Sequence, residues 1–491
     1  MSDTPLKLFN SLTRRLERFE PVHPGEARVY TCGPTVYNYP HIGNMRAYVF
    51  ADVLGRTLSW KGYKLTHVIN ITDVGHLTDD ADAGEDKLEK AAAEKAQSIW
   101  EIARHYTEAY WADVKALNIR KPAKWSVATD YIDEMIDFVR SIPEKHLYEI
   151  ESGLYFDVST IEDYGRLARA VTEEGEGRIE TVQGKRNPAD FAIWRKTPAG
   201  ENRQMEWDSP WGKGAPGWHL ECSVMGWDLL GFPFDIHTGG IDHREIHHPN
   251  EIAQNQAFCG YKCLDEASKS GANLWMHNNF LVERSGKMSK SSGEFLRLQL
   301  LIDKGYHPLA YRMMCLQAHY RSELEFSWEG LQAALVRLKR IVNKTEGFQM
   351  PPGGVRPSHP RVQPILDKFD AAMADDLNTP VALTALEEAL ALKKVGEDSL
   401  VEAVAYMDRV LGLSLSPTGT RDELDRVALR IRPKDAEFTE AEIEVALARR
   451  KEARAAKDFA TSDSIRDDLA AKGVEVMDGD PLGWEWKLSA D

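Results

Sequence analysis

In the first 75 residues, the spacing of apolar positions alternates between a strand pattern and a helical pattern. The β-branched run at 26–36 (EARVYTCGPTV) ends in Gly-Pro and predicts a buried strand followed by a turn. Residues 45–63 (MRAYVFADVLGRTLSWKGY) have apolar positions at helical spacing, and 64–74 (KLTHVINITDV) return to a strand pattern. Strand, helix and strand within about 50 residues predict a Rossmann-like parallel sheet. We expect a later strand of this sheet at 232–242 (FPFDIHTGGID).

The pattern changes between the two parts of this predicted sheet. Residues 129–142 (TDYIDEMIDFVRSI) have helical spacing, whereas 153–160 (GLYFDVST) are strand-like and 172–180 (TEEGEGRIE) form a polar loop. We therefore interpret residues 121–207 as an α+β insertion into an α/β domain.

Beyond residue 323 the pattern is almost entirely helical. One of these helices is expected to have Thr379 as its N-cap and Pro380 at its first position. A polar linker at 416–433 precedes a small basic helical unit at 441–473. The chain is thus predicted to end in a helical bundle followed by a small separate domain.

Composition narrows the class of protein. The chain has 491 residues, enough for about three domains, and its formal net charge is −16. This charge argues against a protein that coats nucleic acid with a uniformly positive surface, but it permits a protein that binds RNA through a local basic face. No apolar run approaches the ~18 residues of a membrane helix, and the N-terminus lacks a secretory signal. Five cysteines, an odd number, indicate thiols in a reducing cytoplasm rather than a disulfide framework.

A histidine-rich stretch at 239–254 (GGIDHREIHHPNEIAQ) is the first candidate for chemistry. It holds His243, His247 and His248, with Glu251 just beyond them. The stretch alone is compatible with a metal site, an acid–base cluster, or a polar loop that leads into a helix.

Two further motifs concern phosphates. PHIGN at 40–44 lies between a predicted strand and helix, where His41 can reach phosphate oxygens and Gly43 lets a purine approach the backbone. GKMSKSSG at 286–293 offers Lys287 and Lys290 on a loop suited to closing over a polyphosphate. HIGx followed by KMSKS resembles the signature of class I aminoacyl-tRNA synthetases.

Other segments carry a more specific resemblance. They are YTCGPTVYNYPHIGNMRAY, GWHLECSVM, FDIHTGGID, HHPNEIAQ, WMHNNFLVERSGKMSKSSG, LAYRMMCLQAHYRSELEFS, MADDLNTPVAL and ARRKEARAAKDFATSDSIRDDLAAKGVEVMDG. In this order they resemble cysteinyl-tRNA synthetase, and the resemblance extends from about Leu6 to Trp486. The chain departs from the family at Asn44, where the family has histidine, and at Pro249 in HHPNE, where HHENE is usual.

The resemblance implies one zinc ion in the amino-acid pocket. The positions that match the family's ligands are Cys32, Cys222, His247 and Glu251. Two thiolates, an imidazole and a carboxylate are a plausible zinc set. Zinc binds a substrate thiolate strongly and a serine hydroxyl poorly, so discrimination of about 10⁴ is expected without editing. The other thiols, Cys259, Cys263 and Cys315, are expected to be core or helix-end residues.

The resemblance also implies roles for further residues. The substrate pocket would contain Gly33, Thr35, Thr72, Trp218 and His237. ATP would be bound by His41, Gly43, Gly239, Gly240, Asp242 and Lys290, with Mg²⁺ accompanying it. The catalytic set would be His41, Asn44, Lys287 and Lys290.

The implied enzyme is a cytoplasmic monomer that joins L-cysteine to tRNA-Cys with ATP. Its domains would be a Rossmann catalytic domain (1–120 and 208–265), a connective insertion (121–207), a KMSKS region (266–322), a helical bundle (323–420) and an anticodon-binding domain (421–491). Arg449, Arg450, Lys451, Arg454 and Lys457 would contact RNA phosphates, and Trp484 or Trp486 would stack on a base.

Two alternatives remain open from the residues alone. A zinc-dependent ligase that joins cysteine to an amino sugar would share the zinc set and both signatures, but would not need residues 434–491. A non-catalytic paralogue would tolerate HIGN in place of HIGH but would not need the lysines of KMSKS.

Overall fold

We describe a computed structural model of the chain. It describes residues 4–74, 98–168, 182–201, 203–260, 270–283, 296–348, 357–415 and 425–488, together with the backbone of 286–287. Within these residues, no helix combines the length and apolar character needed to cross a membrane.

A five-stranded parallel sheet forms the centre of the predicted catalytic domain. Its strand order is β11-β10-β3-β4-β5, with bounds Ala272–Asn278, Phe234–Gly240, Glu26–Thr31, Lys64–Ile71 and Lys124–Val127. All four pairings are parallel, as the strand–helix–strand pattern predicts. The carboxyl ends of the strands meet at one edge, which is where ligands bind in such sheets.

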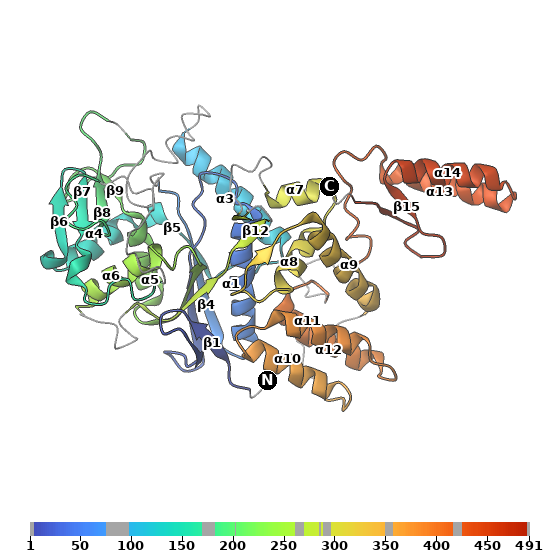
Figure 1. Ribbon diagram of the computed structural model, residues 1–491, viewed down its shortest axis with the longest axis horizontal. Coiled ribbons are helices and arrows are strands. Elements are labelled where there is room, and N and C mark those ends of the chain that lie inside the picture. Colours follow the sequence, from blue (N-terminus) through green and yellow to red (C-terminus); the bar gives the residue numbers. More distant parts are fainter. Residues whose placement is uncertain are drawn as a thin grey trace.

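Helices cover both faces of this sheet (Figure 1). On one face lie α1 (Ile42–Trp60) and α3 (Ile99–Ala116), and on the other lie α5 (Trp218–Leu230) and α6 (His247–Cys259). Helix α1 begins with a capping box: His41 Nδ1 accepts from Asn44 N, and Asn44 Oδ1 accepts from His41 N, each at 3.2 Å. The HIGN motif therefore forms the N-terminus of α1.

The insertion has its own antiparallel sheet. The sheet follows α4 (Ile132–Ser141), and its strands β6, β7, β8 and β9 span Leu147–Ile150, Gly153–Phe156, Phe191–Lys196 and Gly214–Pro216. Both limits of the insertion differ from the predicted 121–207. It begins after β5, because β5 pairs with β4 in the central sheet, and it extends to β9, because β9 pairs with β8 in the insertion. Strand pairing, which composition does not show, sets these limits.

Short elements connect the catalytic domain to the bundle. They are β1 (Lys7–Asn10), β2 (Arg15–Arg18), β12 (Leu281–Glu283), β13 (Gly286–Lys287), β14 (Leu324–Glu325), α7 (Leu298–Asp303) and α8 (Pro308–Leu316). Strand β12 pairs with both β13 and β14.

In the described part of residues 323–420, four helices form the predicted bundle. They are α9 (Trp328–Thr345), α10 (Gln363–Ala374), α11 (Thr379–Leu390) and α12 (Glu397–Leu411). The bundle packs on α1, where the Trp60 ring meets the rings of Phe369 and Tyr406. The N-cap of α11 is Asn378, whose side chain accepts from Val381 N, so the prediction of Thr379 as N-cap is wrong by one residue. Thr379 is already the first helical residue.

A small C-terminal unit extends away from the bundle (Figure 1). It contains α13 (Glu440–Ala455), α14 (Phe459–Ala471), β15 (Val474–Val476) and β16 (Trp484–Trp486). Trp484 and Trp486 are 0% and 6% exposed and form much of its core, so the prediction that either stacks on a base is wrong. A unit this small uses its largest apolar side chains for its own core.

Candidate metal centre and nucleotide site

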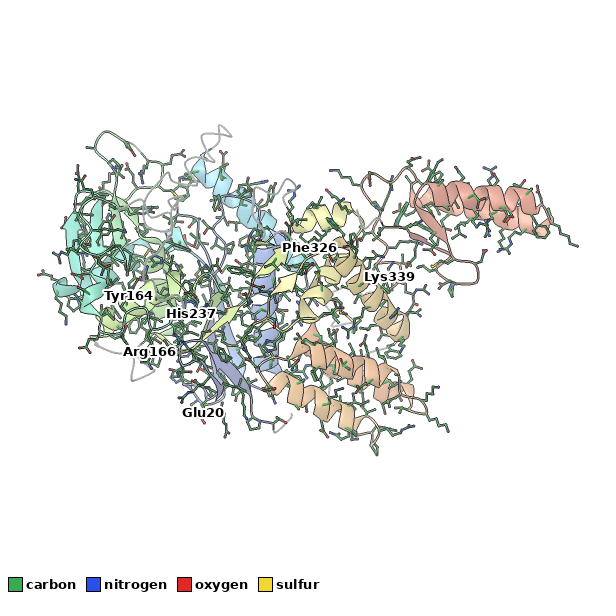
Figure 2. The ribbon with its side chains drawn as sticks, viewed as in Figure 1. Glu20, Tyr164, Arg166, His237, Phe326 and Lys339 are labelled. Carbon is green, nitrogen blue, oxygen red and sulfur yellow. The ribbon has the colours of Figure 1, made fainter. Side chains whose placement is uncertain are left out.

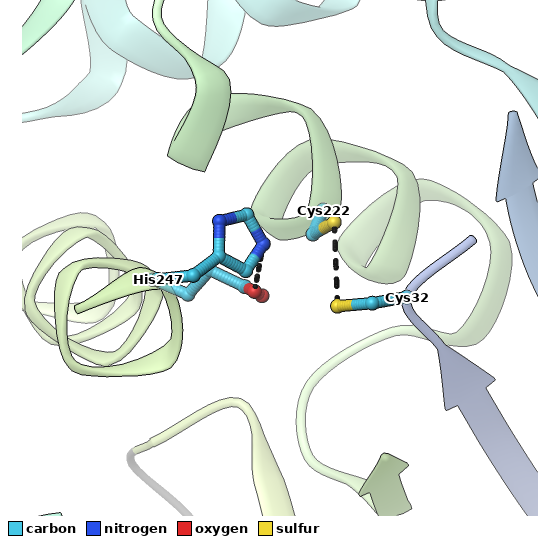
Figure 3. Close-up of side chains that lie close together, drawn as sticks. Cys32, Cys222 and His247 are labelled. Carbon is cyan, nitrogen blue, oxygen red and sulfur yellow. Dashed lines mark hydrogen bonds and ion pairs between the residues drawn. The ribbon is translucent and has the colours of Figure 1, made fainter. Parts of the chain in front are cut away.

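The four predicted metal ligands converge from three elements. Cys32 directly follows β3, Cys222 lies in α5, and His247 and Glu251 lie one turn apart on α6. All four are buried, and one ligand atom from each lies within 4.8 Å of all the others (Figure 3). The cluster sits at the carboxyl edge of the sheet.

Its geometry fits a tetrahedral zinc ion. The Sγ atoms of Cys32 and Cys222 are 3.9 Å apart, which is far longer than a disulfide bond. Zn–S bonds of about 2.3 Å at a tetrahedral angle place two sulfurs about 3.8 Å apart. His247 Nε2 lies 2.9 Å from Glu251 Oε1, so nitrogen and oxygen ligands complete the set. These residues could hold a metal ion.

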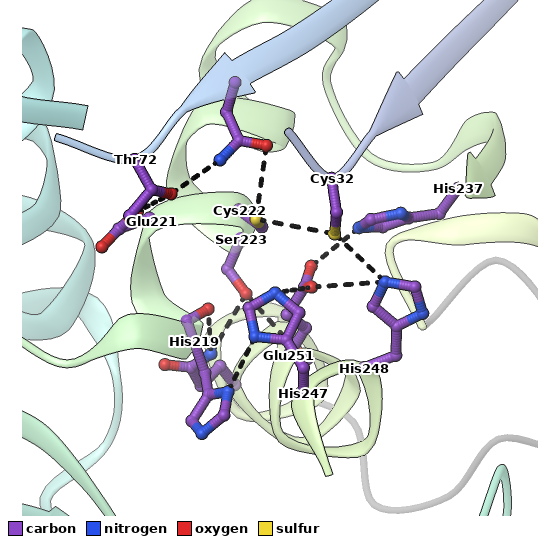
Figure 4. A network of polar contacts seen from close by, with 12 residues as sticks. Cys32, Thr72, His219, Glu221, Cys222, Ser223, His237, His247, His248 and Glu251 are labelled. Atoms are coloured by element: carbon purple, nitrogen blue, oxygen red, sulfur yellow. Dashed lines mark hydrogen bonds and ion pairs between the residues drawn. The ribbon is translucent and has the colours of Figure 1, made fainter. Parts of the chain in front are cut away.

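A second group of donors overlaps the first. His248 Nε2 is 3.2 Å from Cys32 Sγ, and His237 Nε2 is 2.9 Å from Glu251 Oε2 (Figure 4). Cys32, His237, His248 and Glu251 therefore also satisfy the distances of a metal site. The group offers only one thiol, so zinc favours the set with Cys222 and His247. From the sequence, His248 is expected to be a neighbour of the site and not one of its ligands.

Hydrogen bonds behind the ligands orient the imidazoles. His247 Nδ1 lies 3.0 Å from His219 Nδ1, and the backbone oxygen of His219 accepts from Gln254. His248 Nδ1 lies 2.7 Å from His277 Nε2. Such partners fix the tautomer and direction of a ligand ring. Sequence reasoning missed His219 and His277, because nothing in their spacing places them behind α6.

Glu251 and Cys222 ionise more readily at this centre, whereas burial and the contact with Cys222 raise the pKa of the Cys32 thiol well above its ordinary value. Burial raises the pKa of the Glu251 carboxyl, but His237 and His247 outweigh it and lower the pKa to about 2. Burial also raises the pKa of the Cys222 thiol, whereas contacts with Cys32 and His247 bring it down to about 7. Anionic ligands are the form that a metal cation requires.

The predicted substrate residues surround the centre. Gly33 follows Cys32, and a Cβ there would collide with the backbone oxygen of Asn70. Thr35 forms a β-bridge with Thr72, and Thr72 Oγ1 donates to Glu221 Oε2 at 2.8 Å. The Trp218 ring packs on His247 with 4.5 Å between the ring centres.

The predicted nucleotide residues lie at the same edge. Gly239 and Gly240 end β10, and Asp242 follows them. At the start of α1, a Cβ on Gly43 would lie 2.9 Å from two atoms of the His41 ring, so this position accepts only glycine without moving the histidine. The side chain of Lys287, and Lys290 altogether, lie outside the described residues.

The two other described thiols stand apart from the centre. Cys315 is buried in α8, and Cys259 is the last residue of α6. Both positions agree with the core and helix-end roles expected from the sequence, whereas Cys263 lies outside the described residues.

Two family models match separate parts of the chain. Residues 18–336 match the model of the tRNA synthetases class I (C) catalytic domain, and residues 438–481 match the cysteinyl-tRNA ligase anticodon binding domain. The second match argues against the amino-sugar ligase, which would not need such a domain.

Individual relatives and solved structures point the same way. A cysteine–tRNA ligase of Novosphingobium aromaticivorans is 74% identical, over 99% of this chain and 97% of its own, and one of Zymomonas mobilis is 52% identical, over 98% of each. Methionyl-tRNA synthetase of Mycobacterium tuberculosis bound to methionyl-adenylate shares the fold, with a TM-score of 0.52, 13% identity, and coverage of 79% of this chain and 92% of that one. The chain therefore belongs to the cysteinyl-tRNA synthetase family of class I tRNA synthetases.

Proposed function

We propose that this protein activates L-cysteine with ATP and transfers it to the 3′ end of tRNA-Cys, with one zinc ion that recognises the substrate thiol. The observation that carries the proposal is the buried set of two thiols, an imidazole and a carboxylate at the carboxyl edge of a nucleotide-binding sheet. Membership of the family supports the reaction, and the donor set supports the metal.

The reaction needs positioning and charge stabilisation rather than a protein nucleophile. The cysteine carboxylate attacks the α-phosphate of ATP, which forms cysteinyl-adenylate and releases pyrophosphate. A ribose hydroxyl of the terminal adenosine then attacks the acyl carbon of the adenylate, which breaks the bond to the phosphate and releases AMP. Cys32, Cys222, His247 and Glu251 would hold zinc, which when bound supplies a soft acceptor for the substrate thiolate. Thr72, which donates to Glu221, and Trp218, which packs on His247, would orient the amino acid beside it.

The nucleotide is assigned to the residues around the start of α1. His41, with Asn44 as its capping partner, would contact the phosphates, and Gly239, Gly240 and Asp242 would bind the ribose. Lys287 and Lys290 would stabilise the charge on the leaving pyrophosphate, and Mg²⁺ would accompany ATP.

We assign RNA binding to exposed residues of the C-terminal unit. Arg449, Lys451 and Lys457 are exposed, whereas Arg450 is buried and pairs with Asp478 through two bonds of 2.6 and 2.8 Å. Arg454 contacts the same carboxylate at 3.0 Å. Phe459, 62% exposed at the start of α14, takes the stacking role that the buried tryptophans do not have.

Two assays in sequence test the proposal. Cysteine-dependent ATP–pyrophosphate exchange should occur with the zinc-loaded protein and be lost in Lys290→Ala. Total tRNA should then accept labelled cysteine from the same preparation. Absence of exchange would disprove the activation step, and exchange without charging would disprove tRNA as the acceptor. Gel filtration should give the mass of one chain, as proposed for a monomer.

A further inference from the structure

The buried Arg46 joins three parts of the chain. It lies in α1, two residues after the HIGN motif, and is 2% exposed. Its Nη1 donates to the backbone oxygens of Asn279 and Phe280 at 2.9 and 2.5 Å, and its Nη2 to those of His319 and Ser322 at 3.3 and 2.6 Å. The fork of donors on a guanidinium allows one side chain to hold both backbone segments.

One of these segments leads to the first lysine of KMSKS. Phe280 directly precedes β12, and Val282 in β12 pairs with Lys287 in β13. The start of β12 also touches the HIGN turn, since a Cβ on Gly43 would lie 3.6 Å from Leu281 Cβ. Arg46 thus fixes the HIGN helix to the segment that precedes Lys287.

The segment after KMSKS returns to the same turn. The backbone oxygen of Leu296 accepts from Ile42 N at 2.8 Å. The next residue, Arg297, places its guanidinium over the ring of Tyr39, with 4.6 Å from Cζ to the ring centre. The Tyr39 hydroxyl in turn lies 2.9 Å from His105 Nε2 on α3.

We propose that Arg46 and Arg297 are positioning residues, which fix the two ends of the segment carrying Lys287 and Lys290 against the turn that carries His41. The inference rests on the proposed function, in which these groups share one triphosphate. Groups that must bind neighbouring phosphates need a fixed separation, and a displacement of about 1 Å at a reacting centre costs up to about 100-fold in rate.

The half-buried pair of Arg297 and Tyr39 is tested first, because variants of these residues should keep the fold. Arg297→Gln and Tyr39→Leu should each lower the kcat/KM for ATP in pyrophosphate exchange by about three- to tenfold, as expected for loss of a cation–π contact and its alignment. The KM for cysteine should change by less than about twofold, since the zinc pocket is untouched. The double variant should be no worse than the more affected single variant.

Arg46 is tested beside a matched control. Arg312 is also buried, at 0% exposure, and donates to the backbone oxygens of Leu411 at 2.8 Å and Leu117 at 3.1 Å. Neither of these residues lies in the segments that Arg46 holds. Arg46→Lys should lower exchange kcat by about tenfold or more, with the cysteine KM and zinc content unchanged. Arg312→Lys should lower the unfolding temperature without this selective loss.

The outcomes separate the inference from the proposed function. If the unmodified protein shows no exchange, the proposed function fails. If the unmodified protein is active, two results would disprove the positioning role alone. In the first, the Arg46 and Arg297 variants lose no more exchange activity than Arg312→Lys. In the second, they change the kinetic parameters for cysteine and for ATP equally.

Discussion

The thiols of Cys32 and Cys222 lie 3.9 Å apart, although 190 positions separate the two residues in the chain. Cys32 is held by the end of β3 and Cys222 by α5, which packs on the same sheet. Neither residue has to move to approach the other, because both lie on packed elements of the fold. The packing of β3 and α5 in the same domain therefore holds the two thiols side by side.

Replacing one of these thiols should impair metal binding and cysteine recognition together. Cys222→Ser exchanges a soft ligand for a hydroxyl, so bound zinc should fall well below one per chain and the KM for cysteine should rise by at least about tenfold. Metal analysis and pyrophosphate exchange measure the two effects. Cys259→Ser, at the end of α6, should change neither. Full zinc content in Cys222→Ser would exclude Cys222 as a ligand.

A single methyl group at Gly43 should disturb the nucleotide site. The Cβ of Gly43→Ala would approach Cε1 and Nδ1 of His41 to 2.9 Å, so the ring must leave its bond to Asn44 N. Exchange activity is expected to fall by about 10- to 100-fold. Gly396→Ala is the control, because nothing lies within 4 Å of a Cβ there. Equal activity of the two variants would contradict the role of the His41 position.

The packing of α1 against the bundle depends on the buried carboxylate of Asp52. Asp52 is 4% exposed and contacts Arg56 Nε at 2.7 Å and Arg312 Nη2 at 2.8 Å. Asp52→Asn leaves these cations without their anion, so the free energy of unfolding should drop by about 3–5 kcal/mol. Asp137→Asn removes only an exposed pair with Arg140 and should change it by less than about 1 kcal/mol. Denaturant unfolding of both variants provides the comparison.

The same carboxylate should contribute to acid sensitivity. Burial raises the pKa of Asp52, but Arg56, Arg312 and Arg120 outweigh it and hold the pKa below its ordinary value of 3.8. A carboxyl with a lowered folded-state pKa stabilises the fold above pH ~4, and this stabilisation disappears as the pH falls below that value. The stability difference between the unmodified protein and Asp52→Asn should therefore shrink below pH ~4. A difference that is constant between pH 7 and pH 3 would refute this assignment.

An ion pair joins the bundle to the C-terminal unit. Lys339 Nζ on α9 lies 2.8 Å from Glu485 Oε2 on β16, and Figure 2 shows Lys339 on the side of the bundle near that unit. Lys339→Met and Glu485→Gln should each lower the kcat/KM for tRNA charging by about two- to fivefold and leave pyrophosphate exchange unchanged. Lys368→Met, which breaks an exposed pair within the bundle, is the control. An equal loss in that variant would argue against the interdomain role.

Two aromatic residues of the C-terminal unit should respond differently to substitution. Phe459→Ala removes an exposed ring, so the binding of tRNA should weaken by about 1–3 kcal/mol, which raises the KM for tRNA in the charging reaction. The unit should stay folded. Trp484→Ala removes a buried ring and should destabilise the unit by about 3–5 kcal/mol. Charging kinetics and circular dichroism separate the two effects. Loss of structure in Phe459→Ala would show that its ring is part of the core.

Much of the architecture was accessible from local patterns. The predicted strands at 26–36, 64–74 and 232–242 contain β3, β4 and β10, and the helix at 45–63 corresponds to α1. Such patterns are reliable because the period of apolar residues states directly which side of an element is buried. The four proposed zinc ligands required more, since their prediction depended on family resemblance and not on spacing.

Local patterns and motifs were enough to predict the element types, the order of the motifs and the chemical nature of the donors. The tertiary structure alone decided which donors meet: it joined Cys32 to Cys222, placed His248 and His237 at the same centre, and set His219 and His277 behind the ligands. It also decided that Trp484 and Trp486 are core residues and that Arg46 in α1 donates to the backbone oxygens of Asn279 and Phe280. The physical reason is that periodicity records burial within one element, whereas contacts between elements depend on strand order and helix packing, which no short stretch of sequence contains.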